Sequence, residues 1–120
     1  MNDQEALEYI SGYFGELFDK RNLEALDDYL DPDYFDDDIG DPAVDHISNS
    51  KEYLRQWFIE QPSIGVEVRG VSVKDDVISA FLEWYVSENG IKKVIRRGVA
   101  IFVLRNQRII KRHTFIYYEA

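Results

Sequence analysis

The sequence predicts an α+β fold in which three N-terminal helices pack on a curved, mainly antiparallel sheet. Before Pro62, apolar residues recur at the spacing of amphipathic helices. After Pro62, the chain is rich in β-branched and aromatic residues, with turn-forming pairs between the apolar runs. Helices followed by a meander of hairpins favour a layer of helices on one face of the sheet. The length of 120 residues suits one domain, residues 1–120.

The first helix is expected over residues 6–18, where the apolar positions are Ala6, Leu7, Ile10, Tyr13, Phe14, Leu17 and Phe18. Gly12 and Gly15 interrupt it, each at a cost of about 1 kcal/mol relative to alanine. This pattern indicates either a close neighbour at that turn or a tolerated irregularity.

Two shorter helices are expected before Pro62. Asn22 can cap one that runs through Leu30 and ends at the Asp31-Pro32 step, because proline disfavours the helical conformation in the preceding residue. Asn49 with Glu52 resembles a capping box that opens the other. Its apolar side carries Tyr53, Leu54, Trp57 and Phe58.

Four strands are expected over Val66–Val73, Val77–Val86, Ile91–Leu104 and Ile109–Tyr118. The joints between them are Asp75-Asp76, Asn89-Gly90 and Asn106-Gln107. Asn89-Gly90 is the strongest turn signal, because both residues tolerate the positive φ that a type I′ hairpin requires. Consecutive hairpins predict an antiparallel meander.

The strands are apolar on both faces, which an antiparallel sheet with one solvated face would not be. One set of alternating residues is Ile78, Ala80, Leu82, Trp84 and Val86, and the opposite set includes Val77, Phe81 and Tyr85. The helices can cover only one of these faces. We therefore expect a homodimer in which a second copy of the chain covers the open face of the sheet.

Composition and charge narrow the function classes. The absence of cysteine excludes disulfides, thiolate metal sites and cysteine nucleophiles. A net charge of −9 argues against nucleic acid and anionic membranes as partners. Residues 1–60 carry a balance of −13 and residues 61–120 of +4, so the halves attract one another within the fold or across a dimer. With no signal peptide or apolar span at the N-terminus, the expected location is cytoplasmic.

An aspartate-rich segment lies in the first half of the chain. It contains Asp27, Asp28, Asp31, Asp33, Asp36, Asp37, Asp38, Asp41 and Asp45. Clustered carboxylates can bind a divalent metal, but Phe35 stands where an EF-hand needs an oxygen ligand, and no glycine follows it. A solvated acidic surface is the favoured interpretation, and we expect neither a metal nor a cofactor.

Two pairs of segments carry a family resemblance. Residues 17–26 read LFDKRNLEAL and residues 29–34 read YLDPDY, while residues 97–104 read RGVAIFVL and residues 108–113 read RIIKRH. The chain resembles the SnoaL-like branch of the nuclear transport factor two-like superfamily, which includes polyketide cyclases and ketosteroid isomerases. The resemblance implies a cone-shaped, cystatin-like α+β roll with a pocket. The superfamily also includes hydrolases, dehydratases and non-catalytic binding modules.

The resemblance also implies catalytic positions. The general-base aspartate of the isomerases corresponds to Asp37, or to its neighbour Asp36 or Asp38. Phe14 stands in place of their oxyanion-donating tyrosine, with Tyr13 expected on another side of the helix. Their second oxyanion donor falls near Ala100, and the acid-base aspartate of the cyclases falls near Thr114. This sequence thus departs from both catalytic sets.

The residues themselves leave the acid-base group open. Since alternate strand residues face opposite sides, either Asp37 points inward or both Asp36 and Asp38 do. A base here needs a pKa tuned by an apolar pocket. His113 can serve as its partner near neutral pH, or as a structural histidine at the sheet surface or dimer contact. His46, in a polar loop, is expected to face solvent.

The remaining candidates concern ligand binding. Phe14, Tyr34, Trp57 and Trp84 either line a cavity for a flat apolar ligand or simply form the core. Three basic residues lie on otherwise apolar strands: Arg96, Arg97 and Arg112. One of the three could clamp an anionic group at the cavity mouth, with Arg97 and Arg112 as the chosen ligand-binding candidates; the alternative is an ion pair with the acidic helical half.

The sequence therefore predicts a homodimeric pocket domain that binds a small, mainly apolar metabolite. If it is an enzyme, we expect a cofactor-free isomerase or cyclase with Asp37 as base and His113 as its partner. The alternative is a non-catalytic module for dimerisation or protein binding.

Overall fold

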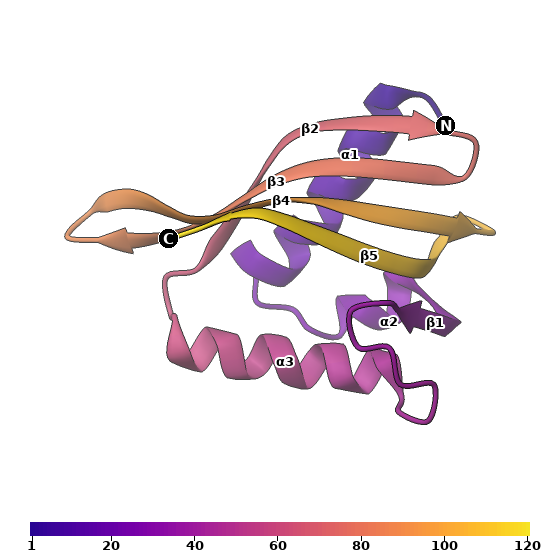
Figure 1. The fold of residues 1–120 in the computed structure, drawn as a ribbon, viewed down its shortest axis with the longest axis horizontal. Helices are drawn as coiled ribbons and strands as arrows, with labels where there is room; N and C mark the ends of the chain where they lie inside the picture. The colour runs from indigo at the N-terminus through magenta and orange to yellow at the C-terminus, as the bar shows by residue number, and fades with distance from the viewer.

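A computed structural model describes residues 1–120, and it confirms the α+β arrangement with the helices first and the meander after them (Figure 1). The helical elements are α1 (Asp3–Phe14), a π-helical turn η1 (Gly15–Asp19), α2 (Ala25–Tyr29) and α3 (His46–Glu60). The strands are β1 (Leu30–Asp36), β2 (Gly65–Lys74), β3 (Val77–Glu88), β4 (Ile91–Arg105) and β5 (Arg108–Glu119). None of the helices is both long enough and apolar enough to cross a bilayer.

The sheet has the strand order β1-β5-β4-β3-β2. The strands β2 to β5 form the expected antiparallel meander, and β1 joins its edge in parallel with β5. Asn89 and Gly90 have φ angles of 52° and 76°, as a type I′ hairpin requires. Asn106 and Gln107 also adopt positive φ between β4 and β5.

Helix α1 begins with a capping box at Asn2, which lies before the expected start of the helix. The Asn2 side chain accepts a hydrogen bond from the Glu5 backbone N–H at 2.8 Å, and the Glu5 carboxylate accepts one from Asn2 at 3.0 Å. Of the two alternatives for the glycines, Gly12 has a close neighbour, because the Tyr29 hydroxyl lies 3.0 Å from the position that a Cβ would take. A larger residue at Gly12 would displace Tyr29. The expected helix continues beyond Phe14 as η1.

Helix α2 is shorter than expected, because Leu30 is already extended and begins β1. Asn22 does not cap it. The Asn22 side-chain amide instead donates to Glu16 at 3.3 Å, on the π-helical turn. The proline at position 32 is thus accommodated within an edge strand rather than beyond a helix end.

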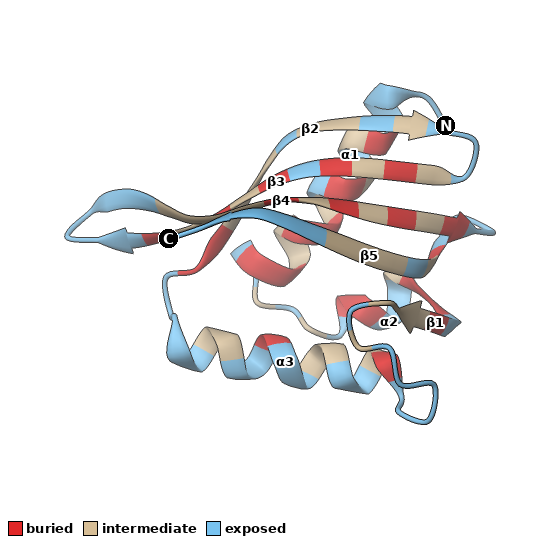
Figure 2. Ribbon diagram, viewed as in Figure 1, coloured by how far each residue is buried: buried red, intermediate tan, exposed pale blue.

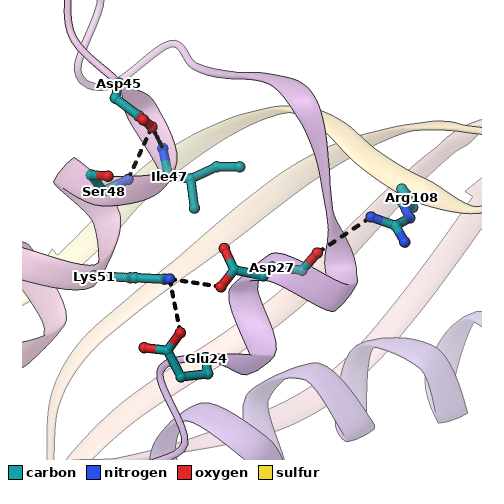
Figure 3. A network of polar contacts seen from close by, with 7 residues as sticks. All are labelled: Glu24, Asp27, Asp45, Ile47, Ser48, Lys51 and Arg108. Atoms are coloured by element: carbon teal, nitrogen blue, oxygen red, sulfur yellow. Dashed lines mark hydrogen bonds and ion pairs between the residues drawn. The ribbon is translucent and has the colours of Figure 1, made fainter.

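Helix α3 begins at His46, before the expected capping box, because Asp45 provides the cap. The Asp45 carboxylate accepts hydrogen bonds from Ile47 and Ser48 at 3.0 and 3.1 Å (Figure 3). Figure 3 also shows how the start of α3 is attached to α2, since Lys51 pairs with Asp27 at 2.8 Å and with Glu24 at 3.3 Å.

The two faces of the sheet differ in burial. Along β3 and β4, buried positions alternate with more exposed ones (Figure 2). The buried set on the helix-covered face includes Ile78, Ala80, Leu82, Trp84, Val86, Ala100, Phe102 and Leu104. In Figure 1, α1 crosses behind the strands, whereas α3 lies below the sheet, with η1 and α2 between them. The opposite face is open, and Phe81 and Phe115 are 45% and 56% exposed there.

Candidate functional site

The helices and the covered face of the sheet enclose a cavity of about 410 Å³. Its apolar walls are Tyr13, Phe14, Leu17, Phe18, Leu26, Ile39, Tyr53, Leu54, Trp57, Trp84 and Ile116. Its polar walls are Asp36, Asp38, Asn49, Ser50, Arg96, Arg112 and Thr114. A mainly apolar cavity with a few charged groups is typical of small-molecule sites, since the apolar walls bind the ligand body and the charges orient it.

Aromatic side chains from three different elements form much of the apolar wall. Phe14 comes from α1, Trp57 from α3 and Trp84 from β3, and all three were candidates for ligand binding. The Phe18 ring, on η1, links α1 and α3, because its centroid lies 6.1 Å from that of Phe14 and 6.0 Å from that of Trp57, on which it packs edge-to-face. Flat, rigid walls of this kind suit a planar apolar ligand.

Arg112, the fourth sequence candidate in the wall, is the cation at the β1–β5 side of the cavity. It is the register partner of Asp36 across the parallel strand pair. The Arg112 Nε donates to the Thr114 hydroxyl at 3.1 Å, and its guanidinium carbon lies 5.4 Å from the centre of the Phe102 ring. No carboxylate oxygen lies within 4.0 Å of the nitrogens of the Arg112 guanidinium. By contrast, each arginine of β4 has such a partner, namely Arg96, Arg97 and Arg105. The Arg112 guanidinium therefore has no ion-pair partner among the side chains of the cavity.

The surroundings of Arg112 favour its charge. Burial alone would lower the pKa of Arg112, but the Tyr13 and Tyr34 hydroxyls and the carboxylates of Asp36 and Asp38 oppose this, and the pKa is raised. Burial raises the pKa of Tyr13, and Arg112 offsets only part of that effect. Tyr13 is therefore a neutral phenol at physiological pH and a potential hydrogen-bond donor beside a fixed cation.

Asp36 and Asp38 are the two carboxylates in the cavity wall. Asp36 accepts hydrogen bonds from the Asp38 backbone N–H at 2.9 Å and from the Tyr34 hydroxyl at 3.3 Å. Asp38 accepts one from the Thr114 backbone N–H at 3.1 Å, and its other oxygen lies 3.3 Å from the His113 Nδ1. The Asp36 carboxylate is therefore held by residues 34 and 38, and the Asp38 carboxylate by two residues of β5.

Asp37 and His113, the expected acid-base pair, lie outside the cavity wall. Asp37 follows the last residue of β1, in the turn at residues 37–39, and its carboxylate lies 3.5 Å from the Lys111 Nζ rather than in the cavity wall. His113 belongs with Lys111 to the open face of the sheet, where its ring packs edge-on against Phe115 at 4.3 Å. Of the two alternatives for the aspartates, the structure shows the one in which Asp36 and Asp38 point inward.

Tyr34 and Arg97 also lie outside the wall. Tyr34 is buried behind Asp36, and burial strongly raises the pKa of its hydroxyl. Arg97 belongs to the open face, where its Nε donates to Glu83 at 2.7 Å and its guanidinium carbon lies 4.8 Å from the centre of the Tyr118 ring. Its partner comes from the sheet itself rather than from the acidic helical half.

His46 is buried, with only 5% of its surface exposed, so the expectation that it faces solvent was wrong. The Phe35 ring stacks on it at a centroid distance of 4.5 Å. Its Nδ1 accepts a hydrogen bond from the Asp36 backbone N–H at 2.9 Å, so the other ring nitrogen carries the proton and donates to the Asp41 carbonyl at 2.7 Å. His46 thereby fixes the backbone that presents Asp36.

Tyr13 and Arg96 are two polar residues of the wall that were not chosen as site residues from the sequence. Tyr13 was expected on another side of the helix, but the apolar stripe of α1 is wide enough for Tyr13 and Phe14 to be buried side by side. Arg96 was one of three basic strand residues, and it was not chosen as a ligand-binding candidate. Arg96 lies an even number of residues from Ala100 and Phe102, which are completely buried, and such residues share one face of a strand. This spacing was the available signal that Arg96 faces inward.

No group of three or more histidine and acidic side chains is arranged to hold a metal ion. The aspartates of the acidic segment serve different purposes. Asp45 caps α3, Asp27 pairs with Lys51, and Asp31 pairs with Arg105 at 2.7 Å. The two that line the cavity, Asp36 and Asp38, are separated by the outward-pointing Asp37.

Several solved structures share this fold. TsrD from Streptomyces laurentii has a TM-score of 0.77 at 14% identity, with 98% of this chain and 91% of that chain covered. IdmH from Streptomyces antibioticus has a TM-score of 0.72 at 16% identity, with 92% and 90% covered. A SnoaL-like polyketide cyclase from Agrobacterium tumefaciens has a TM-score of 0.71 at 12% identity, with 90% and 87% covered.

No curated protein sequence matches this one. A family model, however, matches most of its length. The model describes the SnoaL-like domain and covers residues 10–112, from the second half of α1 to Arg112 in the cavity wall. The chain therefore belongs to the SnoaL-like domain family.

Proposed function

We propose that the cavity binds a small, flat, mainly apolar metabolite, and that the chain is a cofactor-free enzyme of the isomerase or cyclase type that acts by proton transfer. One observation carries this proposal. A single apolar cavity contains the carboxylates of Asp36 and Asp38 together with a guanidinium without an ion-pair partner, that of Arg112, and the neutral phenol of Tyr13.

These groups suit the removal of a proton from carbon next to a carbonyl. A carboxylate takes the proton, and the electron pair of the broken C–H bond moves to the carbonyl oxygen. Arg112 and Tyr13 can then stabilise the oxyanion by hydrogen bonds inside a largely apolar cavity, where such bonds are strongest. Where a C=C bond is conjugated with the enolate, return of the proton to its far carbon gives an isomer. Attack of the enolate carbon on a second carbonyl closes a ring, and the alkoxide so formed takes the proton back from the carboxylic acid. Neither outcome needs a redox partner.

Asp36 is the better candidate for the base. It is the register partner of Arg112, and His46 holds its backbone N–H at 2.9 Å. The Asp38 carboxylate is already in contact with the Thr114 backbone and with His113. In this proposal His113 acts through Asp38 as a positioning residue, and Asp37 has no part in the reaction. The solved polyketide cyclase of the same fold supports the reaction class.

Deuterium exchange into a simple ketone tests the proposal, whichever ketone the natural substrate is. We expect the protein to accelerate incorporation of deuterium at the α-carbon of 2-tetralone, a flat bicyclic ketone, in D₂O followed by proton NMR. Loss of a general base typically lowers such a rate by about 10²–10⁴-fold, which we expect for Asp36→Asn. Asp37→Asn is the matched control, because its carboxylate lies on the same segment and outside the cavity, and we expect it to exchange like the parent.

Two results would contradict this assignment. Exchange by the parent no faster than in buffer would remove proton abstraction from ketones of this class. Loss of exchange in Asp37→Asn with full activity in Asp36→Asn would move the base to Asp37, and the inward orientation of Asp36 would have no catalytic meaning.

A second proposal concerns the open face of the sheet. We propose that two copies of the chain associate there, because Phe81, Val99 and Phe115 form a row of register partners across β3, β4 and β5, and the two phenylalanines are about half exposed. Light scattering coupled to gel filtration should give the mass of a dimer at micromolar concentration, and Phe115→Asp should give that of a monomer. A parent protein that is monomeric under these conditions would remove the dimer. A purely non-catalytic dimerisation module would show the dimer without the exchange.

A further inference from the structure

Arg96 is a second cation in the cavity, in surroundings unlike those of Arg112. Its guanidinium carbon lies 5.1 Å from the centre of the Trp57 ring and 5.8 Å from that of Trp84, so indole rings from α3 and β3 both contact the cation. Its side chain is 27% exposed, which places the charged group at the boundary between the cavity and solvent. Two aromatic faces restrict the orientation of the guanidinium before any ligand arrives.

The two arginines mark different ends of the site. Arg112 pairs in register with Phe102 on β4, and Arg96 precedes Phe102 by six positions on that strand. At about 3.3 Å per residue, this corresponds to roughly 20 Å of strand between the two ends. A ligand whose carbonyl meets Arg112 therefore extends toward Arg96 along the covered face of the sheet.

Arg96 already has a carboxylate partner, Glu119, but the geometry of the pair is not the strongest that arginine can form. Its Nε and Nη2 both donate to one oxygen of Glu119, at 3.1 and 2.7 Å, so the pair does not use the parallel two-oxygen geometry that is strongest for arginine. The Glu119 side chain is 59% exposed, at the last residue of β5. Exposed ion pairs of this kind are weak, so another anion can replace Glu119.

The Arg96 cation is retained with or without a ligand. Burial alone would lower its pKa, but Glu119 and the Tyr53 hydroxyl stabilise the charge, and the pKa lies above the usual value for arginine. Tyr53 also lines the cavity and is 56% exposed, so it stands with Arg96 at the rim. A phenol, a guanidinium and two indoles together suit the end of a ligand that is both planar and acidic.

We propose that the ligand of this cavity carries an acidic group, such as a carboxylate, and that Arg96 binds that group in place of Glu119. This inference rests on the proposed function, because it takes the cavity as the ligand site, and it adds the chemical class of the ligand. Arg96 is then a specificity residue that distinguishes an acid from its neutral analogue, while Arg112 serves the reacting carbonyl.

Two fluorescent probes of matched shape test this. 1-Anilinonaphthalene-8-sulfonate is a flat aromatic anion, and N-phenyl-1-naphthylamine has the same aromatic body without the sulfonate. The only two tryptophans of the chain, Trp57 and Trp84, both line the cavity, so quenching of their emission reports binding there. We expect the anion to bind more tightly than the neutral probe.

Substitutions assign the difference to one residue. Since a hydrogen-bonded charge pair is worth more than a neutral one, Arg96→Met should weaken binding of the sulfonate probe by about tenfold or more. It should leave the neutral probe within about twofold, which also shows that the cavity remains folded. Glu119→Gln should tighten binding of the sulfonate probe, because it removes the carboxylate that competes for Arg96. Arg97→Met is the matched control on the open face and should change neither probe.

The outcomes separate this inference from the function on which it rests. If neither probe quenches the tryptophans, the cavity is not a binding site and the proposed function fails with it. If both probes bind and Arg96→Met weakens them equally, the pocket stands and anion recognition by Arg96 is wrong. If Arg112→Met weakens binding of the sulfonate probe and Arg96→Met does not, the acidic group lies at the Arg112 end of the cavity and the proposal is overturned. Dependence on Arg97 would place the probe on the open face and overturn it as well.

Discussion

The covered and open faces of the sheet come from the same strands, yet neighbouring residues have opposite surroundings. Arg96 stands between two indoles in the cavity wall, whereas Arg97 pairs with Glu83 on the open face. Arg112 lines the cavity, whereas His113 beside it packs against Phe115 outside. A shift of one residue in register would exchange these sets, so the position of the chemistry depends on strand register as much as on residue type.

The largest expected effect is the loss of a buried ring on the covered face, compared with the loss of a ring on the open face. Phe102 is completely buried beneath α1, where it contacts the rings of Tyr13 and Phe14. Phe102→Ala should therefore lower the free energy of unfolding by about 3–5 kcal/mol, the cost of a cavity of that size. Phe81 is 45% exposed on the open face, so Phe81→Ala should cost about 1 kcal/mol or less. Urea unfolding followed by circular dichroism measures both.

The same pair of variants also sharpens the dimer proposal. If two copies meet on the open face, Phe81→Ala should weaken association while leaving the unfolding of the isolated chain almost unchanged. The measurement is made at a protein concentration well below the dissociation constant of the dimer. Equal losses of unfolding free energy in the two variants would then mean that the two faces are equally buried within one chain.

A smaller effect is expected from adding a methyl group to a glycine on each face. A Cβ on Gly98 would lie 2.6 Å from the Phe115 carbonyl oxygen and 3.3 Å from the Trp84 ring. Because the carbonyl belongs to the backbone of β5, it cannot move away cheaply, and Gly98→Ala should cost about 1–3 kcal/mol. Gly70 has nothing within 4 Å of its Cβ position, so Gly70→Ala should change stability by no more than about 0.5 kcal/mol.

Thermal melting of the two glycine variants provides the measurement, and the tryptophan emission of Gly98→Ala gives a second readout. A shifted emission maximum is expected there, because the added methyl group lies against Trp84. A Gly98→Ala variant as stable as Gly70→Ala would show that β4 and β5 can separate slightly at this point, and that the inner surface of the sheet is less tightly packed than the distances indicate.

The difference between the faces also explains what the sequence could predict. The spacing of apolar residues and the Asn89-Gly90 turn determined the meander, because strand period and turn chemistry are local properties. In β3 the alternation also sorted the residues into the two sets that the structure shows, but both sets are largely apolar, so the sequence did not tell which set the helices cover. In β5 both sets mix polar and apolar residues, so the sequence could not tell that Arg112 and Thr114 face inward and His113 outward.

The inward aspartates were beyond sequence reasoning for a similar reason. Asp36, Asp37 and Asp38 have the same side chain, so no difference in residue type marks the face. The orientation depends on pairing with β5 and on His46, which lies ten residues further along the chain and binds the backbone of Asp36. The capping aspartate at position 45 and the burial of His46 belong to the same long-range arrangement.

The smallest expected effect distinguishes a buried from an exposed carboxylate on β1. Asp31 is 7% exposed, and it accepts hydrogen bonds from the Asp33 backbone N–H at 2.9 Å and from Arg105. These two contacts, the backbone bond first, lower the pKa of Asp31. Its unfolded pKa is about 3.9, so the folded state binds this proton less readily than the unfolded chain does. Asp31 thus stabilises the fold above about pH 4, and this contribution is lost as the pH falls through the lowered folded value.

Asp31→Asn should therefore flatten the acid limb of the stability curve. Between about pH 5 and pH 2, the parent should lose more unfolding free energy than the variant, because only the parent has this carboxylate to protonate. The Asp33 side chain is 77% exposed, and Asp33→Asn should follow the parent curve closely. Urea unfolding at half-unit pH intervals makes the comparison. Parallel curves for the parent and Asp31→Asn would mean that Arg105 and the Asp33 backbone contribute no preference for the charged form, and that burial on this edge strand has no electrostatic consequence.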